Sequence, residues 1–76
     1  MSISEQSNYE ILNVTQADRF CAVFENGQKI RLACWVLLKD KITNEYILTG
    51  AYSRLGDGAK LTLGVNDNEL TRYTPI

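Results

Sequence analysis

The sequence predicts an all-β fold, a small antiparallel meander of five to six strands. Short runs of β-branched and aromatic residues alternate with clusters of turn formers, which is typical of strands joined by tight connections. Turns are indicated at Asn26-Gly27, at Asp40–Asn44 and at Gly56–Ala59. When the strands are paired across these turns, apolar residues fall on one face each time. A one-residue slip at any turn would move them to the other face, so this agreement favours a sheet.

Such a sheet must hide one face and limit its exposed edges, and a small chain does both by curling. We therefore expect an SH3-like or similar small barrel, with an open sheet that dimerises face to face as the alternative. At 76 residues the chain has room for one domain. Residues 1–8 are polar and are expected to form a flexible tail, and residues 9–76 a single small β domain.

The first expected strand is Tyr9–Thr15, which is rich in aromatic and branched residues. Its Leu12 and Val14 suit a strand with one buried side. Gln16–Asp18 is expected to form a turn or a short loop before the next strand.

The central hairpin runs from Arg19 to Lys39 and turns at Asn26-Gly27. A two-residue type I′ loop needs positive φ at both central positions, and Asn and Gly tolerate that best. This loop length places Val23 opposite Ile30 and starts an apolar stripe. The other face of the hairpin then carries an aromatic and basic set: Phe20, Ala22, Phe24, Lys29, Arg31, Ala33, Trp35 and Leu37.

The later turns extend the apolar stripe. A loop over Asp40–Asn44 pairs Leu38 with Tyr46, and a two-residue Asp57-Gly58 loop pairs Tyr52 with Leu63. Both tyrosines are therefore expected in the core.

The C-terminal part carries a cap and a last strand. Asn66–Glu69 is expected to form a cap or a single 3₁₀ turn. Leu70–Ile76 then suits a short strand, and Pro75 indicates a sheet edge because it cannot donate to a ladder.

A helix over Gln28–Lys41 is the competing interpretation, because Leu, Ala and Lys are good helix formers. In such a helix Leu32, Trp35 and Val36 would spread apolar surface around the cylinder, which suits only a fully buried helix. The strand interpretation is therefore preferred.

Catalytic chemistry is not indicated. The chain has no His, so the usual general base is missing. Cys21 and Cys34 fall on the expected core face, where reduced, buried thiols are the common outcome. We expect no enzyme activity, no metal site and no cofactor.

The aromatic and basic face is the candidate partner-binding site, formed by Phe20, Phe24, Lys29, Arg31 and Trp35. Three interpretations compete. The chain's own ends could cover the face as a second core, or the face could be an exposed patch for another protein or a second copy. In the third interpretation the rings stack single-stranded nucleic-acid bases while the basic residues meet phosphates.

The expected function is a non-catalytic protein-binding module or inhibitor-like accessory factor that can self-associate, with a nucleic-acid-binding small barrel as the alternative. The net charge of −1 and the pI near 5.2 argue against a strong grip on phosphates. The polar N-terminus lacks the features of a signal peptide, and no apolar run is long enough to span a bilayer. These features predict a soluble cytoplasmic protein without a membrane partner.

Overall fold

The chain folds into two β-sheets in a computed structural model, which describes residues 2–3, 8–54 and 60–76. The first sheet has five strands in the order β1-β7-β6-β5-β2, and the second has three in the order β4-β3-β8. Their bounds are β1 Ser2–Ile3, β2 Tyr9–Gln16, β3 Phe20–Phe24, β4 Lys29–Arg31, β5 Cys34–Asp40, β6 Tyr46–Tyr52, β7 Lys60–Leu63 and β8 Leu70–Pro75, with the 3₁₀ helix η1 at Gly64–Asn66.

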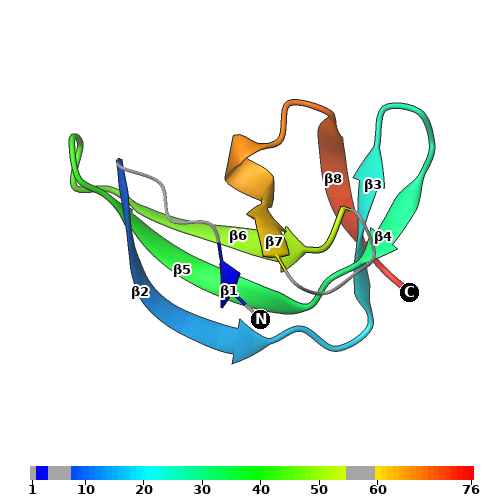
Figure 1. The fold of residues 1–76 in the computed structure, drawn as a ribbon, viewed down its shortest axis with the longest axis horizontal. Coiled ribbons are helices and arrows are strands. Elements are labelled where there is room, and N and C mark those ends of the chain that lie inside the picture. The colour runs from blue at the N-terminus through cyan, green and yellow to red at the C-terminus, as the bar shows by residue number, and fades with distance from the viewer. Residues whose placement is uncertain (1, 4–7, 55–59) are drawn as a thin grey trace.

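The five-stranded sheet is curled, and the strands of the three-stranded sheet run across one end of it (Figure 1). All pairings are antiparallel except that of β1 with β7. The predicted all-β fold with a curled antiparallel sheet is therefore confirmed. Ser2–Ile3, which was expected to belong to a tail, is a strand. The predicted turn at Gly56–Ala59 and the rest of residues 1–7 lie outside the described residues.

The chain changes sheet at Leu32 and Ala33, inside the segment predicted to be one long strand. The Leu32 N–H donates to Phe20 O in the three-stranded sheet, at 3.0 Å. The next N–H, of Ala33, donates to Ala51 O in the five-stranded sheet, at 2.8 Å. The predicted hairpin strand is thus divided into β4 and β5. The strand interpretation of this segment is confirmed over the helical one, but its continuity was wrong.

The Asn26-Gly27 turn forms where predicted, with a different loop length. Phe24 N–H donates to Gln28 O, and Gly27 N–H donates to Phe24 O, both at 2.9 Å, so the loop holds three residues. Only Gly27 of this loop has a positive φ, of 86°. A three-residue loop with glycine in the left-handed region is the second common hairpin solution. Ala22, not Val23, therefore pairs with Ile30.

The two later registers also differ from the prediction by one residue. Asn44 takes the left-handed conformation with φ of 62°, and its N–H donates to Asp40 O at 2.8 Å. This leaves a four-residue loop, so Tyr46 pairs with Lys39 and not with Leu38. The Tyr46 side chain is consequently 67% exposed, and its predicted place in the core was wrong.

At the third connection, Ala51 pairs with Leu63 in place of the predicted Tyr52. Tyr52 is nevertheless fully buried, as predicted.

Two apolar clusters result from this arrangement. The first lies on one face of the five-stranded sheet and contains Cys34, Val36, Leu38, Ala51, Leu61 and Leu63. The second lies between the sheets and contains Ala17, Ala22, Phe24, Leu32 and Tyr52, with Phe20, Ile30, Trp35, Leu70 and Tyr73 packed against it.

Tyr73 ties β8 to β6. The Gly50 N–H donates to Tyr73 Oη at 2.9 Å, and the Thr49 Oγ1 lies 3.3 Å from the same oxygen. The Val65 N–H donates to Thr49 Oγ1 at 3.0 Å. These two hydroxyls satisfy backbone groups that the sheet ladder no longer reaches. A Cβ at Gly50 or at Gly64 would collide with the Tyr73 side chain, so both positions depend on glycine for this close approach.

Several smaller expectations can be compared directly. Cys21 and Cys34 are free and buried, as predicted. The 3₁₀ turn exists but begins at Gly64, two residues before the predicted segment. β8 is an edge strand that ends at Pro75, as predicted. Within the described part of the chain, no helix has the length and apolar character that a membrane span requires.

Candidate interaction surfaces

The predicted aromatic residues lie between the two sheets. Phe24 is only 2% exposed and contacts Tyr52 edge to face, with ring centroids 5.4 Å apart. Trp35 is half-buried and packs edge to face on Phe20 at 5.5 Å and on Tyr73 at 5.1 Å. Since Tyr73 belongs to β8, the chain's own C-terminal strand covers these rings. This arrangement corresponds to the interpretation in which the chain's own ends cover the aromatic face and form a second core.

The predicted basic residues lie on the opposite face of the three-stranded sheet. Lys29 pairs with Val23 and Arg31 with Cys21, whereas the inward-facing Ile30 pairs with Ala22. The expected single surface of aromatic and basic side chains is therefore not formed. The cause is the third residue of the Asn26-Gly27 loop, because a shift of one residue exchanges the two faces of a strand.

A third basic residue joins Lys29 and Arg31 on this outer side. Arg72 of β8 pairs with Val23, so it flanks that residue on the side opposite Lys29. All three basic side chains are exposed. We call Lys29, Arg31 and Arg72 the basic face.

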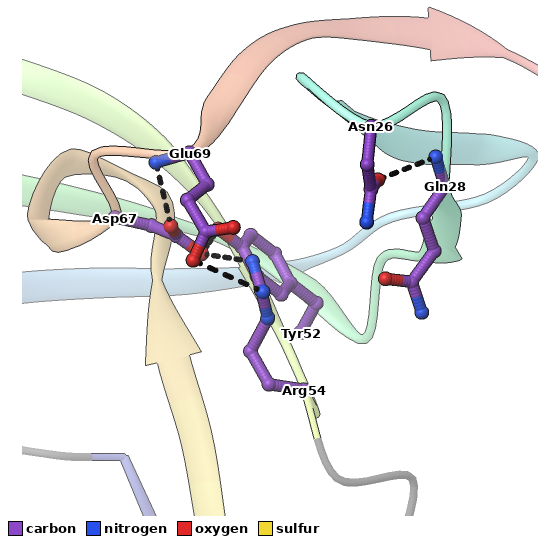
Figure 2. Close-up of polar contacts among 6 residues, drawn as sticks. All are labelled: Asn26, Gln28, Tyr52, Arg54, Asp67 and Glu69. Atoms are coloured by element: carbon purple, nitrogen blue, oxygen red, sulfur yellow. Dashed lines mark hydrogen bonds and ion pairs between the residues drawn. The ribbon is translucent and has the colours of Figure 1, made fainter.

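A polar cluster joins the end of β6 to the segment before β8 (Figure 2). Tyr52 Oη and Arg54 Nη1 each donate to Asp67 Oδ2 at 2.8 Å, and the Glu69 N–H donates to Asp67 Oδ1 at 3.0 Å. Arg54 also lies over the Phe24 ring, with its Cζ 4.3 Å from the ring centroid. The cluster therefore fastens the C-terminal segment to the second apolar cluster.

The same contacts shift the protonation equilibria of the cluster. Burial pushes the pKa of Asp67 upward, but the hydrogen bonds from Tyr52 and Glu69 N–H and the charge of Arg54 outweigh it, so this pKa lies below its usual value of 3.8. Burial, followed by the hydrogen bond to Asp67, raises the pKa of Tyr52. These shifts describe a structural anchor that stays charged at neutral pH.

The cysteines and the possible metal ligands are the other groups in the described residues that could carry chemistry. Burial raises the pKa of the Cys34 thiol, which opposes formation of the nucleophilic thiolate. Among residues 2–3, 8–54 and 60–76, no three His, Cys, Asp or Glu side chains are grouped to hold a metal ion. This part of the chain also encloses no pocket.

Among the residues that the structure describes, β2 is the last strand of the five-stranded sheet and pairs with β5 alone. Its apolar side chains are unusually exposed: Ile11 is 37%, Leu12 42% and Val14 47% accessible. The prediction that Leu12 and Val14 share one buried side was wrong. A β-bulge between Ile11 and Asn13 shifts the alternation of side chains by one residue. Ile11 and Val14 therefore lie on the same face of the sheet, where they pair with Leu38 and Val36 of β5.

The backbone groups of β2 that point away from β5 can be identified from the register. Asp40 N–H donates to Glu45 O at 2.8 Å, so the even-numbered residues of β5 direct their backbone groups toward β6. The residues of β2 that pair with them therefore direct their backbone N–H and C=O groups away from β5. Consistent with this, the Val14 N–H donates to the side chain of Asn13 at 3.0 Å. The residues whose backbone groups point away from β5 are Tyr9, Ile11, Val14 and Gln16. We call this set the β2 edge.

The edges of the three-stranded sheet are different. β4 carries Lys29 and Arg31 and has only three residues, and β8 carries Arg72 and ends at Pro75. Short length, basic side chains and proline are the usual means by which proteins protect a sheet edge. β2 has eight residues, no Lys, Arg or Pro, and Glu10 as its single charge.

The sequence indicated the β2 strand but not its exposure. Branched and aromatic residues predict a strand on either an edge or a central position, and the bulge has no signature in the residues Ile11–Asn13. The near absence of charge in Tyr9–Gln16 is a signal that could have indicated a contact surface.

Comparison of the chain with family models, curated proteins and solved structures finds no match.

Proposed function

We propose that this chain is a non-catalytic protein-binding domain that takes up an extended strand of its partner at the β2 edge. A partner strand would extend the five-stranded sheet through backbone hydrogen bonds, and its side chains would cover those of β2. This mode of recognition gains affinity from the main chain and specificity from alternate side chains. The observation that carries the proposal is the β2 edge, which no other strand in the described part of the chain covers and whose Ile11 and Val14 side chains are exposed.

The exposed apolar side chains of β2 support the proposal, because apolar surface left open on a small domain is typical of an interaction site. Ile11 is 37%, Leu12 42% and Val14 47% exposed. The packing of Phe24 and Trp35 between the sheets also supports a site away from these rings.

The proposal can be tested by selection from a displayed library of random peptides. Val14→Pro removes the outward N–H and leaves the bonds to β5 in place, because the Val14 N–H does not point toward β5. Selected peptides should lose at least tenfold in affinity for Val14→Pro and keep their affinity for Leu48→Lys, an exposed apolar position off the edge. Circular dichroism checks that both variants fold.

Binders that tolerate Val14→Pro, or a library that yields none for the folded wild type, would contradict the proposal. If proline unfolds the domain, Val14→Lys serves as the second variant, since an edge lysine opposes strand addition.

A second candidate function is supported by the basic face. Lys29, Arg31 and Arg72 on neighbouring strands suit an anionic ligand such as single-stranded nucleic acid. Because Phe24 and Trp35 lie on the other side of this sheet, bases could not stack on them, and the contacts would be with phosphates. Binding of a labelled oligonucleotide should then fall steeply with salt and disappear in Arg31→Glu. Binding that is insensitive to both would exclude this function.

A further inference from the structure

The arrangement of the β2 edge is self-complementary. Its outward residues are Tyr9, Ile11, Val14 and Gln16, and they are symmetric about the midpoint between Leu12 and Asn13. Two antiparallel copies of β2 can therefore be placed so that Ile11 faces Val14 and Tyr9 faces Gln16. In this register, every outward backbone group of one copy meets an outward group of the other.

The bulge determines which residues face each other in this register. In a regular strand, alternate residues point the same way, so Ile11 and Val14, three positions apart, would point in opposite directions. The extra residue between Ile11 and Asn13 brings them into phase. The two copies would be related by a twofold axis at the midpoint between Leu12 and Asn13. The bulges of the two copies would face each other beside this axis, so the register would be the same on both sides of it.

The side chains agree with this register. Ile11 and Val14 lie on the same face of the sheet, so each would cover the other's exposed surface across the pair. Glu10, the single charge of β2, would face Thr15 of the second copy, and no two like charges meet. A contact in which the same patch serves both subunits is the usual form of a homodimer.

We propose that the partner of the β2 edge is a second copy of this chain, joined by antiparallel β2–β2 pairing with Ile11 opposite Val14. This inference rests on the proposed function, because it names the strand that the edge takes up. The dimer would join the two five-stranded sheets into one continuous sheet. An interface made chiefly by one strand pair is at the small end of specific interfaces, so we expect a dissociation constant on the order of 10 µM.

Sedimentation equilibrium tests the association. The wild type should show a monomer–dimer equilibrium, Val14→Lys should be monomeric, and Leu48→Lys should behave as the wild type. A wild type that stays monomeric up to about 1 mM overturns the inference. So does a dimer that Val14→Lys leaves intact.

Disulfide trapping tests the register. Residues directly opposite in a hydrogen-bonded antiparallel pair have Cα atoms about 5.5 Å apart, within reach of a disulfide. A mixture of Ile11→Cys and Val14→Cys should therefore form several-fold more cross-linked dimer than either variant alone, since neither position lies opposite itself. Equal cross-linking in the mixture and in the single variants overturns the register. The wild type, whose two cysteines are buried, is the control.

These outcomes can be separated from those of the peptide selection. A monomeric wild type that still selects β2-dependent peptides would overturn the second copy as partner and leave the proposed function standing. Loss of both would remove the proposed function itself.

Discussion

Tyr73 shows how one side chain can fix the end of a strand. Its hydroxyl accepts from the Gly50 N–H, and its ring occupies the space that a Cβ at Gly50 would need, 2.7 Å from Tyr73 Cε1. Gly50→Ala should therefore displace the ring and destabilise the fold by about 2 kcal/mol, the usual scale of overpacking. Urea unfolding followed by circular dichroism measures the loss.

Tyr73→Phe supplies the control for this contact. It leaves the Gly50 N–H without its partner and should lower the free energy of unfolding by about 1–2 kcal/mol. Because a Cβ at Gly64 would collide with the Tyr73 hydroxyl, Gly64→Ala should be less damaging in the Tyr73→Phe background than in the wild type. Strictly additive losses would contradict the contact.

Asp67 makes the stability of the protein depend on acid pH. Its folded-state pKa lies below the usual value of 3.8, so the unfolded chain binds a proton first as the pH falls. The stabilisation by this carboxylate is fully present above about pH 5 and is lost as the pH falls through the lower, folded pKa. Asp67→Asn should be less stable than the wild type at about pH 7, with a smaller further loss between about pH 5 and about pH 2. The free energy of unfolding of each protein is measured by urea titration across that pH range. An equal loss in the wild type and in Asp67→Asn would contradict the stabilisation of the Asp67 carboxylate by the cluster.

At the scale of elements, the left-handed residues determine the hairpin registers. Gly27 has φ of 86° and open space where a Cβ would lie, so Gly27→Ala meets only backbone strain. We expect a loss of about 1 kcal/mol, seen as a lower melting temperature. Asn44 has φ of 62°, and Asn44→Gly, which relaxes the same strain, should leave the stability within about 0.5 kcal/mol of the wild type. Equal effects of the two changes would show that φ is not the controlling variable.

The same residues explain how far the sequence could predict the fold. Asn26-Gly27 and Asp40–Asn44 correctly located two chain reversals, since turn formers act locally. Which loop residue enters the left-handed region is decided by the packing of the flanking strands, and each misjudged loop moved a register by one. Lys29 and Arg31 consequently lie on the opposite face of the three-stranded sheet from the aromatic residues with which they were predicted to share a surface. The aromatic members of the candidate site could be predicted to share a surface, and cover by the chain's own ends was one of the three interpretations. The sequence could not choose among the three, because the contact of Trp35 with Tyr73 joins segments that are distant in the chain.

For the whole molecule, Trp35 is the natural probe because it is the single tryptophan and lies between the sheets. Trp35→Ala should remove its contacts with Phe20 and Tyr73 and destabilise the fold by about 3 kcal/mol. In the wild type, tryptophan fluorescence and far-UV circular dichroism should report one coincident unfolding transition. Two separated transitions would mean that the sheets do not depend on each other.

The change of sheet at Leu32 and Ala33 allows the opening of each sheet to be measured at adjacent residues. These two adjacent amides donate to Phe20 and to Ala51, one in each sheet. Their hydrogen-exchange rates under native conditions would measure the opening of each sheet from neighbouring positions in the chain. Equal protection is expected if both amides are released by global unfolding alone. Faster exchange at one of them would identify the sheet that opens first.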